Sequence, residues 1–413
     1  MRAGAPGGRV YDAASMEQYD SIVVGAGPGG STTAYRLAAA GRSVLLLDRA
    51  EFPRDKPCGG GLTIRAVKLL PFSVEPVVEA RVDAMRFRVG FGSSFERKCR
   101  GPVVLMTQRR QLDQFLVEQA VAAGAEFCQG AKVTALEADE GGVVVRWWGG
   151  ADGTGGVARA ATLVGADGCN GVVPRLLGLG GDYTHGVALE ANVPYAGSER
   201  ARYDGAAVIE LGTVPGGYGW VFPKGDHFNV GVAGWDAEGP HLRRHLAELC
   251  AAHDVTVDRL ADQRGYRLPL RLPGSPLVQG RALLIGDAAG VVDPLTGDGM
   301  YEAILTGKLA SDAILDLLEG RAAGLDGYET AVRRVLGPLA AASWGAKVAF
   351  DRFPRATFML ARVPLVWRAV EGLMRGELSH PGAARGLARG PLRALQALAR
   401  VAGDPGRAFK PEP

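Results

Sequence analysis

Residues 21–30 read Ser-Ile-Val-Val-Gly-Ala-Gly-Pro-Gly-Gly, and this stretch decides the fold. Four residues typical of a buried strand run into Gly25-x-Gly27-x-x-Gly30, and a helical pattern follows. In this spacing Gly25 permits a tight turn, Gly27 lets the backbone approach a pyrophosphate, and Gly30 allows close packing of helix on strand. The stretch therefore predicts a dinucleotide site at a helix N-terminus.

The next apolar run, residues 43–47, ends at Asp48, 18 residues beyond Gly30. A strand, a helix and a second strand within about 30 residues form a βαβ unit, which implies a parallel sheet. The carboxylate of Asp48, at the end of the second strand, is expected to accept hydrogen bonds from ribose hydroxyls.

A second pair of glycine-rich segments separates FAD from NAD as the dinucleotide. Gly286-Asp287-Ala288-Ala289-Gly290 follows a buried strand, and Pro294-x-x-Gly297-x-Gly299 opens a long helix. The Asp287 carboxylate suits a polyol such as a ribityl chain, and a helix N-terminus stabilises negative charge on a reduced flavin ring. The other interpretation of Asp287, a helix N-cap, is compatible with this one. We predict FAD.

Composition supports an ordinary globular chain of 413 residues, 47% of them apolar and 22% charged. Glycine is unusual: 60 residues are about twice the usual share of roughly 7%. The net charge of +3 conceals a basic end, because residues 331–413 hold 14 Lys and Arg but 5 Asp and Glu. We interpret this end as a helical region with a solvated Arg-rich face or a contact with anionic lipid, and expect no nucleic-acid partner.

The five cysteines are scattered, with no C-x-x-C pair, which predicts reduced thiols and a cytoplasmic protein. No run approaches the roughly 18 apolar residues of a membrane span, and the N-terminus lacks the pattern of a secretory signal. His241, His245 and His253 invite a metal site, but Arg243 and Arg244 would repel a cation, so no metal is predicted.

Several strings resemble a known family. Residues 25–30, 164–168 and 286–300 look like the FAD-containing fold of the para-hydroxybenzoate hydroxylase type. Within that fold, Lys56-Pro-Cys-Gly-Gly-Gly-Leu62 and Pro215-Gly-Gly-Tyr-Gly-Trp-Val-Phe-Pro223 resemble the geranylgeranyl reductase family, and the second matches its P-x-x-Y-x-W-x-F-P motif. The resemblance runs from about residue 19 to about residue 318.

The resemblance implies an α/β fold with an FAD-binding, Rossmann-like domain on a parallel sheet, an inserted antiparallel β-sheet domain for substrate, and a C-terminal helical region. The expected boundaries are a tail at 1–18, an FAD-binding domain at 19–75, 101–181 and 270–320, a substrate domain at 76–100 and 182–269, and helices at 321–413. The cofactor contacts predicted from motif and resemblance together are Gly25, Gly27, Gly30, Ser31, Asp48, Arg49, Cys58, Gly59, Gly61, Arg109, Val133, Asp167, Asp287, Gly297, Gly299 and Met300.

The same resemblance implies hydrogenation of isolated C=C bonds in a polyprenyl chain. Such alkenes are unpolarised, so hydride transfer needs a nearby acid and a dry, aromatic-lined slot. Cys58, in a glycine-rich loop, is the predicted acid, with packing against the flavin as its other interpretation. Tyr218, Trp220 and Phe222 alternate on a strand and are predicted to line the prenyl channel, although a core aromatic group has the same pattern.

The expected partners are a polyprenyl lipid, quinone or diphosphate as substrate, and NADPH or ferredoxin as electron donor. A prenyl lipid comes from a membrane, so we also expect peripheral contact at the inner membrane face through the Arg-rich helices and their interleaved aromatic residues. Two alternatives remain open: an aromatic hydroxylase or halogenase of the same fold, and a prenyl-lipid carrier that retains FAD structurally. Tyr218 and Phe222 depart from the W-x-W-x-I-P motif of the halogenases.

Overall fold

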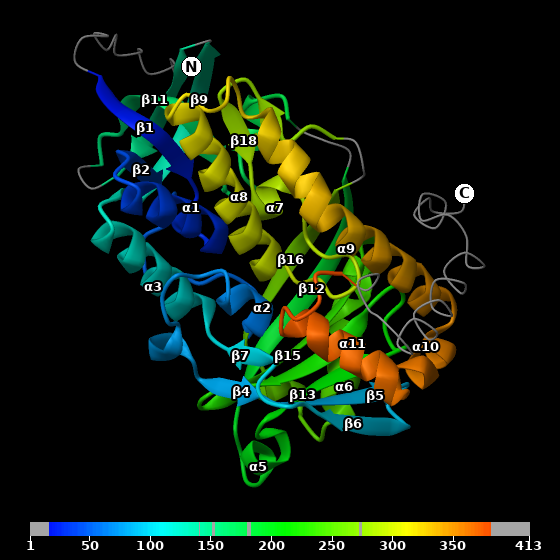
Figure 1. Cartoon of the computed structure of the whole chain (residues 1–413). Coiled ribbons are helices and arrows are strands. Elements are labelled where there is room, and N and C mark those ends of the chain that lie inside the picture. Colours follow the sequence, from blue (N-terminus) through cyan, green and yellow to red (C-terminus); the bar gives the residue numbers. More distant parts are fainter. Residues whose placement is uncertain (1–15, 140, 151–152, 180–182, 272–274, 381–413) are drawn as a thin grey trace.

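The computed structural model describes residues 16–139, 141–150, 153–179, 183–271 and 275–380. Over these residues the predicted fold class is confirmed: a largely parallel sheet with helices, a separate and mainly antiparallel sheet, and C-terminal helices that reach across the second sheet (Figure 1).

The first sheet has eight strands within the described residues. β1 (Glu17–Val24) is parallel to β2 (Val44–Leu47) on one side and to β11 (Gly156–Gly165) on the other. The remaining strands are β8 (Glu126–Cys128) beside β2, β18 (Ala282–Leu284) and β17 (Val278–Gln279) beyond β11, and the antiparallel pair β9 (Ala131–Asp139) and β10 (Gly142–Gly149).

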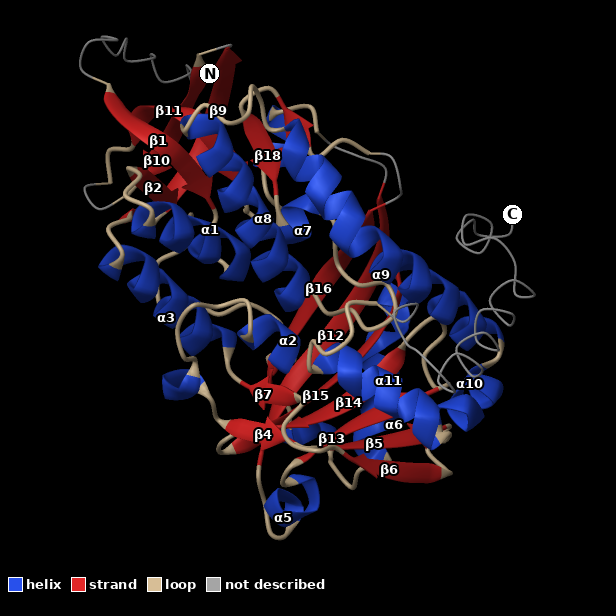
Figure 2. Cartoon of the chain, viewed as in Figure 1, coloured by secondary structure: helices blue, strands red, loops and turns tan. Residues whose placement is uncertain are grey.

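Helices cover this sheet, which is why its strands are continuous apolar runs. Residues 22–24 of β1 and all of β2 are buried, as expected for parallel strands that are shielded on both faces. α1 (Pro28–Ala39) starts with Pro28, whose fixed φ suits the first helical position. α1 packs between α3 (Arg109–Ala122) and α8 (Met300–Leu318), as Figure 2 shows. The sheet edge at the end of β1 therefore meets three helices.

The second sheet has seven strands within the described residues. Its pairs are antiparallel except β5 with β13, which are parallel, a departure from the purely antiparallel sheet expected. The order is β16 (Ala261–Arg271), β12 (Tyr183–Pro194), β15 (His227–Trp235), β14 (Tyr218–Pro223), β13 (Ala206–Leu211), β5 (Ala84–Val89) and β6 (Ser94–Lys98).

A small third sheet links the two larger ones. β7 (Val104–Met106) pairs with β3 (Gly61–Thr63) on one side and with β4 (Ala80–Val82) on the other. The glycine-rich loop that carries Cys58 leads directly into β3. The loop is thereby held between the cofactor and substrate halves.

The remaining helices are short connections or belong to the C-terminal region. The connections are α2 (Ile64–Val67), α4 (Val173–Leu176), α5 (Glu199–Tyr203), α6 (Leu242–Ala251) and α7 (Gly286–Ala289). The C-terminal helices are α9 (Asp326–Arg352), α10 (Pro354–Ala361) and α11 (Pro364–Met374). Trp367 of α11 and Phe358 of α10 contact Phe87 and Phe95 of the second sheet.

The N-terminus differs in part from expectation, and part of each chain end is not described. Glu17 and Gln18 lie in β1, where they pair with Ala158 and Arg159, and so are not tail residues. The rest of the expected tail, residues 1–15, and residues 381–413 of the expected helical region lie outside the described residues.

Candidate active site

The end of β1 has the geometry that its glycines predicted. Gly25 has φ +106°, and an added Cβ would lie 2.3 Å from the carbonyl oxygen of Ala166. A Cβ on Gly30 would lie 1.8 Å from the carbonyl oxygen of Gly25. The turn therefore requires glycine at both positions. It places the N-terminus of α1, with its unpaired N–H groups, where an anion can approach.

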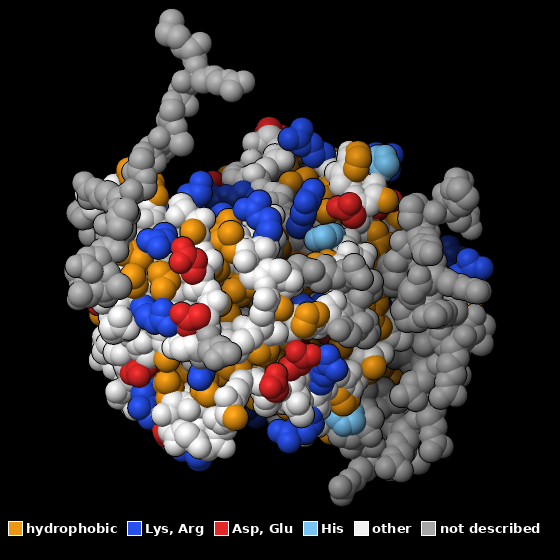
Figure 3. All heavy atoms as spheres, turned by 90° about the horizontal axis from the view of Figure 1, so that it is seen from above, with side chains coloured by type: hydrophobic (Ala, Val, Ile, Leu, Met, Phe, Trp, Pro, Cys, Tyr) orange, Lys and Arg blue, Asp and Glu red, His pale blue; other side chains and the backbone are white. Residues whose placement is uncertain are grey.

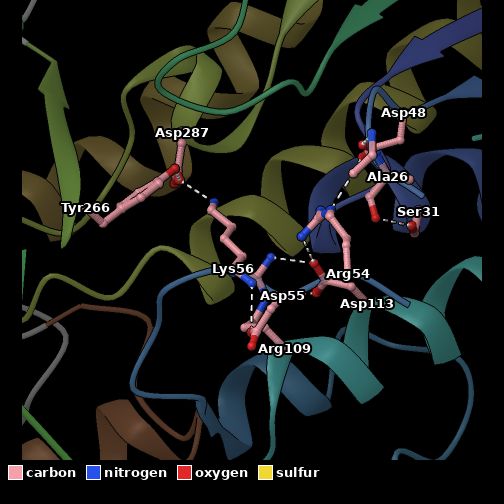
Figure 4. Close-up of polar contacts among 11 residues, drawn as sticks. Ala26, Ser31, Asp48, Arg54, Asp55, Lys56, Arg109, Asp113, Tyr266 and Asp287 are labelled. Atoms are coloured by element: carbon pink, nitrogen blue, oxygen red, sulfur yellow. Dashed lines mark hydrogen bonds and ion pairs between the residues drawn. The ribbon is translucent and has the colours of Figure 1, made fainter. Parts of the chain in front are cut away.

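Asp48 joins the two strands of the βαβ unit. Its Oδ2 accepts from the backbone N–H of Ala26 at 2.8 Å, and its Oδ1 accepts from that of Ala50 at 2.9 Å. The Ser31 hydroxyl donates to the carbonyl of Ala26 at 3.2 Å (Figure 4). Both side chains thus fix the glycine turn itself.

Two guanidinium groups lie beside this turn and share one carboxylate. Arg109 donates from Nε and Nη2 to Asp113 at 2.8 and 2.7 Å, and Arg54 Nη1 lies 2.8 Å from Asp113 Oδ2 (Figure 4). Burial by itself lowers the pKa of Arg109, but the charge and hydrogen bonds of Asp113, together with weaker nearby charges, outweigh burial, so the pKa is raised and the group stays charged. A Cβ on Gly27 would lie 3.7 Å from Arg54 and 3.8 Å from Arg109. Fixed positive charge and a helix N-terminus therefore converge on one place, which fits a diphosphate.

Asp287 lies in α7, directly after β18, and is paired with Lys56, two residues before Cys58. Its Oδ2 accepts from Lys56 Nζ at 2.8 Å and from the Tyr266 hydroxyl at 2.9 Å (Figure 4). Burial raises the pKa of Asp287, but Lys56 and Tyr266 outweigh it, so the pKa lies below its usual value. A Cβ on Gly299 would lie 3.1 Å from Asp287 Oδ1, so the carboxylate faces the start of α8. An ionised carboxylate at this point fits a polyol.

The Cys58 loop (residues 58–60) lies between these polar groups and the second sheet. The backbone N–H of Cys58 donates to Glu190 Oε1 at 2.7 Å, and the N–H of Gly60 points to Cys58 Sγ at 3.4 Å. The Cys58 thiol is half-buried. A fixed loop that carries a partly accessible thiol is suited to present a proton to a bound molecule.

The aromatic residues of β14 form one row. The rings of Tyr218 and Trp220 lie 6.0 Å apart, and those of Trp220 and Phe222 lie 6.1 Å apart. The Tyr218 hydroxyl donates to the carbonyl of Thr296, and Trp220 Nε1 donates to Asn229 at 2.7 Å. A Cβ on Gly59 would lie 2.9 Å from the Phe222 ring. The row therefore runs along the Cys58 loop, with its polar atoms already bonded.

A single cavity of about 960 Å³ connects these features. Its polar part, here called the cofactor cradle, is lined by Gly27, Gly30, Lys56, Arg109, Asp287 and Gly299. Its other part, here called the chamber, is enclosed by β5, β13 and the C-terminal helices, with the side chains of Met85, Phe87, Ile209, Leu211, Leu339, Phe350, Leu360, Trp367 and Leu373. Cys58 and the aromatic row lie on the wall of the same cavity.

The predicted residues divide into two groups. Those on the cavity wall are Gly27, Gly30, Cys58, Gly59, Gly61, Arg109, Tyr218, Trp220, Phe222, Asp287, Gly297, Gly299 and Met300. Those outside the cavity lining are Gly25, Ser31, Asp48, Arg49, Val133 and Asp167. Gly25, Ser31 and Asp48 shape the turn.

Three predicted residues lie outside both the cavity lining and the glycine turn: Asp167, Val133 and Arg49. Asp167 Oδ2 accepts from the N–H groups of Val172 and Val173 at 2.6 and 2.9 Å, where α4 begins. Burial raises the pKa of Asp167 to about 6, against those backbone bonds and the charge of Arg49. Val133 packs in the core of the first sheet. The FAD contacts assigned to these three residues stay predictions.

Sequence reasoning missed the partners that hold the site residues in place. Lys56 and Tyr266 pair with Asp287, Asp113 holds both Arg109 and Arg54, and Glu190 holds Cys58. Lys56 stood in the quoted Lys56–Leu62 string, and Arg109 and Asp113 have the i, i+4 spacing of a helical ion pair, so two signals were present. Tyr266 and Glu190 lie on strands that are distant in the sequence, so no sequence signal linked them to Asp287 or Cys58.

Neither the histidines nor the basic C-terminal helices have the surroundings that a metal site or a membrane-binding face would require. His245 Nε2 lies 2.9 Å from Glu238, and no group of three possible metal ligands occurs among the described residues. Phe350, Phe358 and Trp367 of the C-terminal helices are buried, so these rings are not an exposed membrane face, contrary to expectation. On the end of the molecule seen in Figure 3, basic and acidic side chains lie side by side. Within the part of the chain that the structure covers, no helix has the length and apolar character to cross a bilayer.

Comparison with known proteins agrees with this site. The FAD binding domain family matches residues 18–341. Digeranylgeranylglycerophospholipid reductase 1 of Methanopyrus kandleri is 33% identical over 313 residues, which cover 73% of this chain and 82% of that protein. A menaquinone reductase of Mycolicibacterium smegmatis is 34% identical over 318 residues, covering 71% and 75%. The solved structure of a geranylgeranyl bacteriochlorophyll reductase-like protein from Thermoplasma acidophilum has a TM-score of 0.76 at 22% identity, covering 93% and 100%.

Fold and cradle together define an FAD-binding protein, and the predicted cofactor is confirmed. The relatives narrow this class. The chain belongs to the geranylgeranyl reductase family of FAD-binding proteins.

Proposed function

We propose that the protein is an FAD-dependent reductase that hydrogenates isolated C=C bonds of a polyprenyl chain of the geranylgeranyl type. The observation that carries this proposal is the single cavity in which the cofactor cradle opens into an apolar chamber past Cys58 and the aromatic row. A long hydrocarbon chain needs such a dry chamber, and a reductant bound in the cradle would lie at its inner end. The named activities of the relatives support the substrate class.

Reduced FAD supplies the hydride when it is bound. In the chain itself, the N-terminus of α1 with Arg54 and Arg109 would hold the diphosphate, and Asp287, kept ionised by Lys56, would hold the ribityl hydroxyls. These groups are fixed before the cofactor arrives, since each already has a protein partner. The cradle therefore orients the cofactor with little rearrangement.

The Cys58 thiol would donate the proton that the second carbon of the double bond requires. Its loop is held by Glu190 and lies against Phe222, so the thiol is placed at the junction between cradle and chamber. The faces of Trp220 and Tyr218 would stabilise the positive charge that develops on the more substituted carbon. Their polar atoms are bonded to Asn229 and Thr296, which leaves the rings as an apolar wall.

This proposal names two further components by class only. The head group of the substrate is a lipid, a quinone or a diphosphate, and the electron donor is NADPH or ferredoxin.

Anaerobic stopped-flow measurement tests whether the protein reduces a polyprenyl chain. Chemically reduced holoenzyme is mixed with a geranylgeranyl lipid, and reoxidation is followed at the flavin absorbance band. Reoxidation by the lipid without oxygen supports the reductase. Reoxidation only by oxygen, with hydroxylation or halogenation of an aromatic compound, indicates the alternative enzymes, and lipid binding without reoxidation indicates a carrier.

Peripheral membrane contact belongs to the proposal because a prenyl lipid resides in a bilayer. Met359 of α10 is 58% exposed and follows Phe358, while the neighbouring Leu360 lines the chamber. Flotation of the whole protein with anionic vesicles is expected to weaken severalfold in Met359→Glu. The matched control is Val257→Glu, since Val257 is 56% exposed but lies in the short 3-10 helix Val257–Arg259 before β16, outside the C-terminal helices. Equal flotation of both variants and the unmodified protein would exclude contact through α10.

A further inference from the structure

Lys224 is a buried cation with an unusual set of partners. It follows β14 directly, is 5% exposed, and donates from Nζ to the carbonyl oxygens of Gly59 and Thr107, both at 2.7 Å. Two neutral carbonyls compensate a buried ammonium poorly. Burial accordingly lowers the pKa of Lys224 to about 8, against the opposing influence of Cys58, Glu79 and Glu190. If Lys224 only packed, an apolar residue in its place would make the fold more stable. We therefore look for a role of this charge among its neighbours.

The two carbonyls belong to the Cys58 loop and to the segment that supports it. Gly60 has φ +68°, and an added Cβ would lie 2.1 Å from the Thr107 oxygen and 2.4 Å from Lys224 Nζ. The Thr107 N–H donates to the carbonyl of Gly60 at 2.8 Å. Lys224 therefore closes a ring of hydrogen bonds that joins the loop, the end of β7 and the end of β14.

The same ammonium lies in the electrostatic surroundings of the Cys58 thiol. Four titratable groups from three elements act on this thiol or its loop: Tyr218 of β14 and Lys224 at its end, Arg109 of α3, and Glu190 of β12. Arg109 is already engaged by Asp113 in a bidentate pair. Lys224 is the cation among these four whose bonds go to the Cys58 loop itself.

We propose that Lys224 is a positioning residue for Cys58: it anchors the Cys58 loop to the substrate sheet and keeps a positive charge beside the thiol. The charge stabilises the thiolate that remains after the thiol gives up its proton, and the anchor keeps the sulfur at the mouth of the chamber. The importance of this for turnover rests on the proposed function. The effect on the thiol itself does not.

Alkylation of Cys58 by iodoacetamide tests the proposal without substrate or reductant. The rate is measured on the holoprotein by peptide mass spectrometry from about pH 6 to about pH 10. The midpoint of this profile reports how readily the thiol loses its proton, and the plateau at high pH reports access to the sulfur. In Lys224→Met we expect the midpoint to rise by about half a pH unit or more, because the cation is gone. The plateau is expected to rise as well, because the loop is no longer anchored.

Three further variants sharpen the result. Lys224→Gln is neutral but keeps N–H donors for the carbonyls, and should shift the midpoint like Lys224→Met. Lys224→Arg keeps the charge, and its midpoint should stay within about 0.2 units of the unmodified protein. Lys132→Met removes an exposed lysine of β9 and should change nothing.

Cys250 supplies an internal check on folding, because it is 0% exposed in the core behind the second sheet. Labelling of Cys250 in Lys224→Met would show that this variant has unfolded, and Lys224→Gln then decides. An unchanged midpoint in a folded neutral variant would overturn the proposal. A shifted midpoint in a protein that fails to reduce polyprenyl lipids would leave the role of Lys224 intact and remove the proposed function instead.

Discussion

The cofactor cradle and the chamber share one cavity but are built in different ways. The cradle depends on exact backbone and charge positions. It consists of a glycine with positive φ, a helix N-terminus, and ion pairs whose side chains are fixed by their partners. The chamber depends on side-chain volume, contributed by strands of the second sheet and by helices more than 100 residues later in the chain. The cradle should therefore fail abruptly when one atom is added, whereas the chamber should change its preference gradually.

The largest effect is expected from Gly30→Ala. The added Cβ would lie 1.8 Å from the Gly25 oxygen, so the turn must open, at a cost of about 3 kcal/mol or more. The purified variant should lack flavin absorbance. Gly337→Ala is the matched control, since a Cβ there meets nothing within 4 Å. Its helix should be slightly more stable and its FAD content normal. A flavin-replete Gly30→Ala protein would contradict the account of the turn.

Cys58→Ser tests the junction between the two parts. A serine hydroxyl is a far weaker acid than a thiol, so kcat should fall by about a hundredfold while FAD content stays the same. Cys99→Ser alters another half-buried thiol that lies outside the cavity lining, and should keep its activity. Full activity of Cys58→Ser would show that the thiol only packs against the cofactor.

The Asp167→Asn variant tests whether this carboxylate has a structural role in the cofactor half or holds FAD. The pKa of Asp167, about 6 in the folded protein, lies above the value of about 3.9 in an unfolded chain. Protonation therefore stabilises the fold: this contribution is complete below about pH 4 and is lost as the pH rises through about 6. The variant should be about 3 kcal/mol more stable than the unmodified protein at pH 8, with no such difference below about pH 4.

Urea unfolding at both pH values measures this difference, with exposed Asp236→Asn as the control. Unchanged FAD affinity in Asp167→Asn would place the residue among the structural carboxylates. A large loss of affinity would instead restore the predicted cofactor contact.

The smallest effect is expected in the chamber. Leu211→Trp adds volume at a half-buried position of its wall, so kcat/KM for a long prenyl chain should fall about tenfold while shorter chains are less affected. FAD binding should not change. Leu176→Trp, at a position 36% exposed on α4, should leave both quantities unchanged. An equal loss of kcat/KM for all chain lengths would mean that the chamber does not select substrates by chain length.

The same contrast explains how far sequence could lead. The fingerprint at Gly25, Gly27 and Gly30, and Asp287 with its following helix, could be predicted because their roles depend on backbone geometry and short spacing. Three partners could not be predicted, because only the folded sheet brings them near: Glu190 and Lys224 reach the Cys58 loop, and Tyr266 reaches Asp287. The aromatic residues of α10 and α11 were misjudged for the same reason: their helical pattern fits a membrane face, but the second sheet covers them.

We propose for the whole cavity that a reductant held in the cradle saturates a chain held in the chamber. It is tested most directly by mass spectrometry of a geranylgeranyl lipid after anaerobic incubation with the reduced holoenzyme. We expect a product that has gained one H₂ for each double bond reduced, and about a hundredfold less of it with Cys58→Ser over the same time. A lipid recovered unchanged, or one that carries oxygen or halogen, would contradict it.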